Sequence, residues 1–129
     1  MQVVKQIMSK AIEKVSIDVS VKDVAKMMTE KKIGSVLVEH QGNVIGIITE
    51  TDIVRKAVGQ DISLQDTLAS KIMNSPVLTI DAEATILEAN DMMDKHHIRH
   101  LAVTEEDTFV GVLSVRDLLH PVLLDEEPY

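Results

Sequence analysis

Two short stretches of the chain share a pattern of residue types that can bind a ligand. Residues 46–52 read Gly-Ile-Ile-Thr-Glu-Thr-Asp, and residues 111–117 read Gly-Val-Leu-Ser-Val-Arg-Asp. In each stretch a glycine allows close backbone approach, a hydroxyl follows where an expected strand ends, and a carboxylate comes one helical turn later. Helix starts attract phosphate, hydroxyls donate to phosphate oxygens, and a carboxylate can accept from the hydroxyls of a ribose. This pattern is therefore typical of a nucleotide site.

The same residues have a purely structural interpretation. Thr49 or Ser114 can be the N-cap residue of a helix, and Asp52 or Asp117 can return a hydrogen bond to it from the third helical position. The residue types alone favour this capping box and the ligand site equally.

Residues for other kinds of chemistry are sparse. The sequence contains no phosphate-binding loop, dinucleotide fingerprint, zinc-protease helix or serine-hydrolase elbow, and it has five glycines and no cysteine. No nucleophile, base and orienting group stand in a recognisable set, so we expect no catalytic residues. The alternative of a small metal-dependent hydrolase rests only on the presence of carboxylates and histidines.

Three histidines, His96, His97 and His100, raise the question of a metal site. His96 and His100 have the spacing that can share a helical face, but the helix is expected to end near His97 and no nearby carboxylate completes a set. An exposed helix end is the favoured interpretation, and no metal ligand is assigned. The paired methionines at 27–28 and 92–93 are interpreted as core residues.

The chain repeats itself at a spacing of 65 residues without a gap. Matched pairs include Ile7-Met8 with Ile72-Met73, Met27-Met28 with Met92-Met93, and Gly46 and Asp52 with Gly111 and Asp117. Two copies are too few for a solenoid, so the repeat predicts two similar units packed about a pseudo-twofold axis. We assign residues 1–61 to the first repeat and 62–129 to the second, with a linker at about 59–71 and an acidic tail at 125–129.

Each repeat predicts the element order β-α-β-β-α, which is an α+β fold. In the first, a strand near Val15 is followed by a helix capped by Ser20, a hairpin at 35–48 and a helix that starts at Thr49. The second predicts a strand at 78–80, a helix capped by Thr85, a hairpin at 100–113 and a helix from Ser114. The spacing of Leu64, Leu68 and Ile72 also predicts a helix over 63–73.

The composition disfavours further classes of function. The net charge of −8 and an aromatic content of 2% disfavour nucleic-acid binding, which needs cations and stacking surfaces. No apolar run is long enough to span a bilayer, and no signal peptide is visible. We therefore expect a cytoplasmic protein without membrane or nucleic-acid partners.

With these motifs in place, the chain from Ile7 to Leu123 closely resembles a tandem pair of cystathionine-β-synthase (CBS) domains, or Bateman module. The resemblance is carried by the two Gly-x-x-Thr/Ser-x-x-Asp motifs and by three further stretches. These are Ile33-Gly34-Ser35-Val36-Leu37-Val38, Met73-Asn74-Ser75-Pro76-Val77 and Ile98-Arg99-His100-Leu101-Ala102-Val103.

The resemblance implies a non-catalytic regulatory module that binds adenosine-containing ligands: AMP, ADP, ATP or S-adenosylmethionine. It implies two clefts between the repeats, no required cofactor, a homodimer and an effector protein that reads a conformational change. In one cleft Asp117 holds the ribose and Ser114 reaches phosphate, with Val112, Arg116, Arg99, Ile33, Ile12 and Glu13 around them. In the other, Asp52 and Thr49 take these roles, with Ile47, Ile98, Val77 and Leu78.

Charge distinguishes the two clefts. Phosphates bound to an acidic protein need local cations, and the second repeat supplies Arg99 and Arg116. The first repeat has Gly34 and Thr51 at the matching positions, and Thr51 departs from the arginine that the family often carries there. We therefore expect the Asp117 cleft to bind nucleotide more tightly. The competing hypothesis is a dimerisation or interaction module whose vestigial motifs only cap helices.

Overall fold

A computed structural model of the chain describes residues 2–119, so the predicted acidic tail lies outside the described residues. The chain divides into two compact units. We call residues 13–77 the first-repeat unit. The second-repeat unit consists of residues 2–12 together with residues 78–119.

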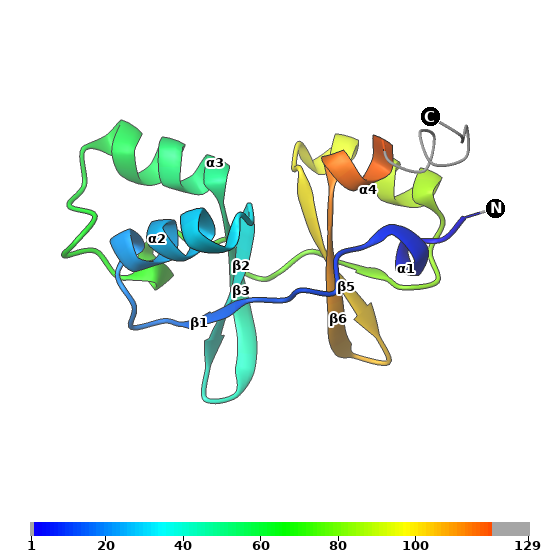
Figure 1. Cartoon of the computed structure of the whole chain (residues 1–129), viewed down its shortest axis with the longest axis horizontal. Coiled ribbons are helices and arrows are strands. Elements are labelled where there is room, and N and C mark those ends of the chain that lie inside the picture. Colours follow the sequence, from blue (N-terminus) through cyan, green and yellow to red (C-terminus); the bar gives the residue numbers. More distant parts are fainter. Residues whose placement is uncertain (1, 120–129) are drawn as a thin grey trace. The chain divides into compact units, whose positions relative to one another are not determined.

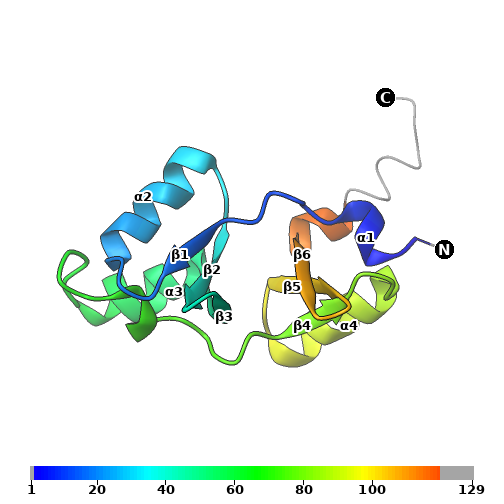
Figure 2. The ribbon, with the colours of Figure 1, turned by 90° about the horizontal axis from the view of Figure 1, so that it is seen from below.

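The first-repeat unit is a three-stranded sheet with helices on one face (Figures 1 and 2). Strand β1 pairs in parallel with β2, and β2 pairs antiparallel with β3. The elements are β1 (Lys14–Ser16), α2 (Val21–Lys31), β2 (Ser35–His40), β3 (Asn43–Thr49), α3 (Glu50–Asp52), the π-helical turn η1 (Ile53–Ala57), and the 3₁₀ turns η2 (Val58–Gln60) and η3 (Ala69–Lys71).

The second-repeat unit has the same plan, with β4 parallel to β5 and β5 antiparallel to β6. Its elements are α1 (Val4–Ile7), β4 (Thr79–Asp81), α4 (Ile86–His96), β5 (His100–Glu105) and β6 (Thr108–Ser114), followed by helical residues 115–119. The α+β class and the β-α-β-β-α order expected from the sequence are confirmed.

Each unit has its own aliphatic core. Val24 and Met28 of α2 pack on Val36, Val38 and Ile48 of the first sheet. The equivalent cluster in the second-repeat unit joins Ala89 and Met93 of α4 to Leu101, Val103 and Leu113. The methionine pairs therefore belong to the cores, as the sequence indicates. Burial of these aliphatic side chains is the main force that holds each helix on its sheet.

The compact units do not coincide with the sequence repeats. The opening segment of the chain packs with the second repeat, where Val4 is fully buried and its amide donates to Ala84 O at 2.8 Å. In the first-repeat unit the matching amide, of Ala69, donates to Val19 O at 2.7 Å. We call residues 2–12 of the first repeat and 62–77 of the second the leading segments. Each leading segment packs in the unit that contains the remaining residues of the other repeat, so the unit boundaries fall after residues 12 and 77.

The helix expected over residues 63–73 is wrong. Only Ala69–Lys71 form a helical turn, and Leu68 is 49% exposed. The carbonyls of this segment serve α2 instead, because Val21 N donates to Thr67 O and Lys22 N donates to Leu64 O, each at 2.9 Å. The first amides of a helix have no partner within it, so these bonds favour an extended segment over a helix of its own.

Among residues 2–119, none of the helices has the length and apolar character required to traverse a membrane.

Candidate functional site

Both Gly-x-x-Thr/Ser-x-x-Asp motifs lie at the junction between the last strand of a unit and the helix that follows. Thr49 Oγ1 accepts from Asp52 N at 3.4 Å, and Asp52 Oδ2 accepts from Thr49 N at 2.8 Å. Ser114 and Asp117 repeat this geometry with the same two distances. The capping box predicted from the sequence is confirmed in both repeats. It holds each carboxylate at a fixed place over the start of its helix.

The motif glycines are explained by a backbone segment that crosses beside them. Asn74 exchanges two backbone hydrogen bonds with Ile47, at 2.8 and 3.0 Å, and Ser9 exchanges two with Val112, at 2.9 Å each. A Cβ atom on Gly46 would lie 3.1 Å from Asn74 O, and one on Gly111 would lie 2.8 Å from Ser9 O. No side chain fits at either position without a shift of that backbone.

The Asp52 carboxylate is enclosed by its own unit. Asn74 Nδ2 donates to Asp52 Oδ2 at 2.7 Å, and Lys56 Nζ lies 3.2 Å from Asp52 Oδ1. Lys56 Nζ also donates to Asn74 Oδ1 at 2.8 Å, so the three side chains form a closed triangle. Asp52 is only 6% exposed. Both of its oxygens are therefore occupied within the protein.

The Asp117 carboxylate is in a different situation. Its Oδ2 accepts from Ser114, while its Oδ1 has no partner among residues 2–119, and the side chain is half-buried. The repeat explains the difference. Ser9 stands where the first-repeat unit has Asn74, and the sequence has Pro121 where the first repeat has Lys56. Serine is too short to copy the reach of the asparagine amide, and proline carries no cation.

The remaining predicted site residues are divided between the units. The first-repeat unit contains buried Ile47 and half-buried Ile33, Glu13 and Val77. The second-repeat unit contains half-buried Val112, Ile12 and Ile98 and exposed Leu78, Arg99 and Arg116. Glu13 faces Lys31 at 3.5 Å. The joint clefts implied by the family resemblance stay a prediction.

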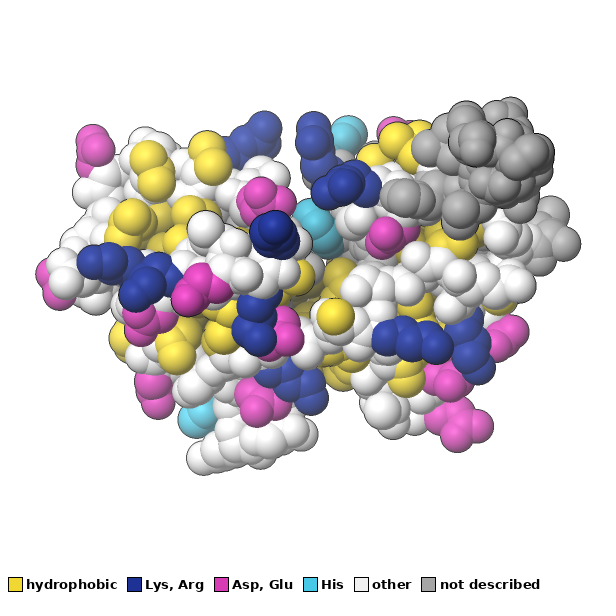
Figure 3. Space-filling model, in the orientation of Figure 1, with side chains coloured by type: hydrophobic (Ala, Val, Ile, Leu, Met, Phe, Trp, Pro, Cys, Tyr) yellow, Lys and Arg dark blue, Asp and Glu magenta, His cyan; other side chains and the backbone are white. Residues whose placement is uncertain are grey.

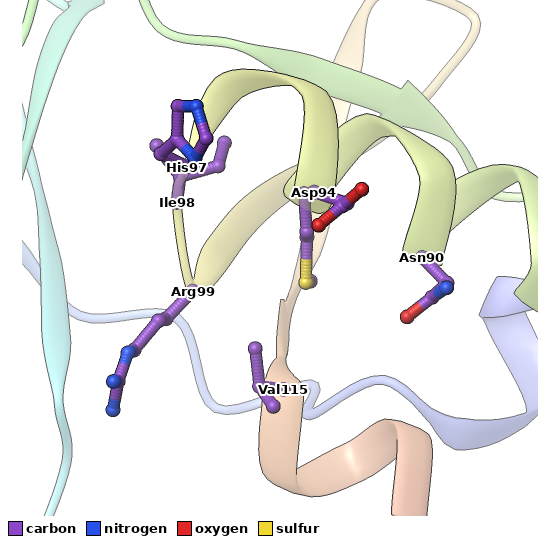
Figure 4. A pocket seen from close by; sticks show the side chains of 7 residues that line it. Asn90, Asp94, His97, Ile98, Arg99 and Val115 are labelled. Atoms are coloured by element: carbon purple, nitrogen blue, oxygen red, sulfur yellow. The ribbon is translucent and has the colours of Figure 1, made fainter.

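A cavity of about 310 Å³ lies at the C-terminal end of α4. Its lining includes two predicted site residues, Ile98 and Arg99, together with Asn90, Met93, Asp94, His97 and Val115. Figure 4 shows Asn90 and Asp94 projecting from α4, with Val115 at the start of the next helix. Val115 N donates to Arg99 O at 2.9 Å, which ties Arg99 to that helix start. Ser114 and Asp117 are not among the lining residues.

The histidines follow the helix-end interpretation. His97 is the C-cap of α4 in the left-handed conformation, and His100 opens β5. Among residues 2–119, no group of three or more His, Cys, Asp or Glu side chains is arranged to hold a metal ion.

Sequence reasoning missed Lys56 and Asn74 as neighbours of the motif. The i,i+4 spacing of Asp52 and Lys56 on one helix could have identified the lysine. Nothing local points to Asn74, because it lies 22 residues from Asp52 and reaches it only through the fold.

Comparison with known proteins identifies the fold. The model of the CBS domain matches residues 4–59 and 69–123. A 17.7 kDa protein from Acidianus ambivalens is 34% identical over 122 residues, which cover 93% of this chain and 73% of that protein. Two other curated relatives are longer, and the chain spans about half of each.

Two solved structures are informative. A protein with CBS domains from Burkholderia ambifaria MC40-6 has a TM-score of 0.92 and 31% identity, covering 99% of this chain and 98% of that one. The CBS domain pair of protein MJ0100, solved with 5′-methylthioadenosine and S-adenosylmethionine, has a TM-score of 0.86 at 23% identity, covering 98% and 99% of the two chains. With its repeated motif, its two matching units and these likenesses, the chain belongs to the CBS domain family as a tandem pair of such domains.

Proposed function

We propose that this CBS domain pair is a non-catalytic sensor of adenosine-containing ligands (AMP, ADP, ATP or S-adenosylmethionine) and that Asp117 accepts the ribose hydroxyls. The observation that carries the proposal is the state of the Asp117 carboxylate. The capping box holds Oδ2, whereas no side chain or amide among residues 2–119 donates to Oδ1. A positioned, half-buried carboxylate oxygen is suited to accept a charge-assisted hydrogen bond from a ligand hydroxyl.

Cations support the same choice of site. Arg116 directly precedes Asp117, and the Arg99 carbonyl is bonded to the amide of Val115 at the same helix start. Both arginines are exposed and can pair with phosphate oxygens in a fork geometry. Ser114 supplies a hydroxyl at the motif, and Val112 supplies an apolar surface. The first repeat has no arginine at either matching position.

Signalling would follow from a shift of population between conformations that bind the ligand with different affinity. An effector protein, or a second copy of the chain, would read the shift. The ligands of protein MJ0100 belong to that protein, and for this chain they are useful as probes.

Calorimetric titration of AMP, ATP and S-adenosylmethionine into the protein tests the site. Asp117→Asn keeps the shape of the side chain but removes its charge, and we expect it to weaken AMP binding about tenfold to a hundredfold. Asp107→Asn in the β5–β6 turn is the matched control, since asparagine tolerates the left-handed backbone found there (φ 65°). Unchanged AMP affinity in Asp117→Asn contradicts the proposal.

A second candidate function is an interaction module without ligand. It is favoured by the exposed apolar side chains Val54 and Val58, 61% and 57% exposed, on the helix that begins at α3. Figure 3 shows hydrophobic side chains on the outer surface of this helix. A ligand that binds only the folded state raises the melting temperature, so no shift with millimolar AMP, ATP or S-adenosylmethionine favours this second function.

A further inference from the structure

The triangle of Asp52, Lys56 and Asn74 is more than a helix cap. The Lys56 ammonium makes three contacts: it forms an ion pair with Asp52 Oδ1 at 3.2 Å, and it donates to Asn74 Oδ1 at 2.8 Å and to Ile72 O at 3.3 Å. The Asn74 amide is equally committed, because Nδ2 donates to Asp52 Oδ2 at 2.7 Å and to Ile47 O at 3.4 Å. Three segments of the first-repeat unit thus converge on one carboxylate.

Because Asp52 is only 6% exposed, a ribose could reach its carboxylate only by moving the Lys56 and Asn74 side chains aside. Its neutral hydroxyls would replace an ammonium and an amide, and the contact between two charged groups is stronger than one with a neutral partner. The displaced carbonyls of Ile72 and Ile47 would also lose a donor. Asp117 imposes no such exchange on a ligand from within residues 2–119.

We infer that Lys56 and Asn74 form an internal latch that occupies Asp52, so that the chain binds one adenosine ligand, at Asp117, and not two. This inference rests on the proposed function for the identity of the ligand. It assigns Lys56 and Asn74 as the residues that set the stoichiometry of binding. The Asp52 motif is then a structural element of the first-repeat unit.

Opening the latch provides the test. Lys56→Met removes the charge and keeps the aliphatic stem, and Asn74→Ser installs the residue that the second-repeat unit has at this place. AMP stoichiometry is measured by equilibrium dialysis and calorimetry on the wild type, the double variant, and the double variant with Asp117→Asn. Lys26→Met, on the exposed side of α2, is the matched control for the loss of a lysine. Circular dichroism and melting curves verify the fold of each protein.

The expected result is one AMP per wild-type chain and per Lys26→Met chain, two per double variant, and one when Asp117→Asn is added to the double variant. Two AMP per wild-type chain, or one per folded double variant, overturns the latch while leaving adenosine binding intact. No binding to the wild type but one AMP per double variant supports the latch and rejects the Asp117 site.

No binding to either the wild type or the double variant rejects both proposals. If the double variant does not fold, Lys56→Met alone decides the question. It is expected to admit a second, weaker AMP, and its failure to do so overturns the latch.

Discussion

The two Gly-x-x-Thr/Ser-x-x-Asp motifs have the same backbone geometry and different surroundings. Thr49–Asp52 and Ser114–Asp117 make matching capping boxes, and in both the backbone amide donates to the aspartate Oδ2 at 2.8 Å. The first carboxylate is then sealed by Lys56 and Asn74, and the second receives no further donor among residues 2–119. The motif therefore fixes where a carboxylate stands, and residues outside it decide whether that carboxylate is available.

One of the two residues that enclose Asp52, Asn74, comes from a leading segment. Residues 73–74 cross beside Gly46, and residues 8–9 cross beside Gly111 in the same register. One segment presents an asparagine to the carboxylate and the other presents a serine, whose Oγ accepts from Ala11 N at 3.3 Å. The same main-chain framework thus leads to a closed site in one unit and an open one in the other.

The largest effect that we expect comes from removing the enclosed carboxylate. Asp52→Ala leaves the amides of Thr49 and Asn74 without their shared acceptor and should lower the free energy of unfolding by about 3 kcal/mol. Half of the Lys56 side chain is exposed and can return to water, which limits the loss. Asp117→Ala removes only a cap and should cost about 1 kcal/mol. Urea unfolding of both variants measures the contrast.

Equal losses from Asp52→Ala and Asp117→Ala would contradict the distinction between a sealed and an open carboxylate. The matched control is Asp66→Ala, which removes an exposed carboxylate that accepts from the hydroxyl of Ser63 at 3.2 Å. We expect its effect to stay within about 1 kcal/mol.

The next effect concerns the close approach beside the glycines. Either alanine methyl would lie 2.5 Å from a methionine sulfur, Met8 Sδ for Gly111→Ala and Met73 Sδ for Gly46→Ala. The backbone contacts differ, because the methyl of Gly111→Ala would lie 2.8 Å from Ser9 O and that of Gly46→Ala 3.1 Å from Asn74 O. The strain should cost about 2 kcal/mol for Gly111→Ala and less for Gly46→Ala, because a side chain yields more readily than a carbonyl. Thermal unfolding compares the two, with Gly59→Ala, 3.0 Å from Val54 O, as a third close contact. A larger loss for Gly46→Ala would reverse the expected order.

Much of the fold could be predicted because its signals are local and duplicated. The caps at Ser20 and Thr85, the two hairpins and the motif positions each depend on residues within a few positions of one another. The helix predicted over 63–73 from the spacing of Leu64, Leu68 and Ile72 is wrong, because the backbone of that segment bonds to the first amides of α2. Hydrogen bonds between this segment and α2 therefore outweigh its helical periodicity.

The candidate site was predictable only in part, for the same reason. Asp52 and Asp117 look alike in sequence, and the arginines at 99 and 116 already favour the second motif. The sealing of Asp52 depends on Asn74, which becomes a neighbour only when the leading segment crosses β3. The exchange of leading segments between the repeats could not be predicted either. The spacing of 65 residues between matching positions is the same whichever unit each leading segment joins.

The helices that precede the two hairpins, α2 and α4, differ in their N-terminal caps, and we expect this difference to have a smaller effect. Ser20 Oγ accepts from Asp23 N at 3.0 Å in α2, and within the described residues the Asp23 side chain does not return a hydrogen bond to Ser20. In α4 the box is reciprocal, because Glu88 Oε1 accepts from both Thr85 N and Thr85 Oγ1 at 3.0 Å. The backbone bond from Thr85, followed by the hydroxyl bond, lowers the pKa of Glu88 below its ordinary value of 4.5.

The reciprocal capping box predicts a pH dependence of stability at the start of α4. A carboxyl whose pKa is lower in the folded than in the unfolded state contributes stability that is fully present above pH 4.5 and is lost as the pH falls through the folded pKa. Glu88→Gln removes the titrating group, so the difference in unfolding midpoint between wild type and Glu88→Gln should shrink as the pH is lowered from 6 towards 3. A difference for Glu88→Gln that stays constant to low pH would mean that the carboxylate does not hold the start of α4, and the contrast between the two helix caps would then be one of geometry alone.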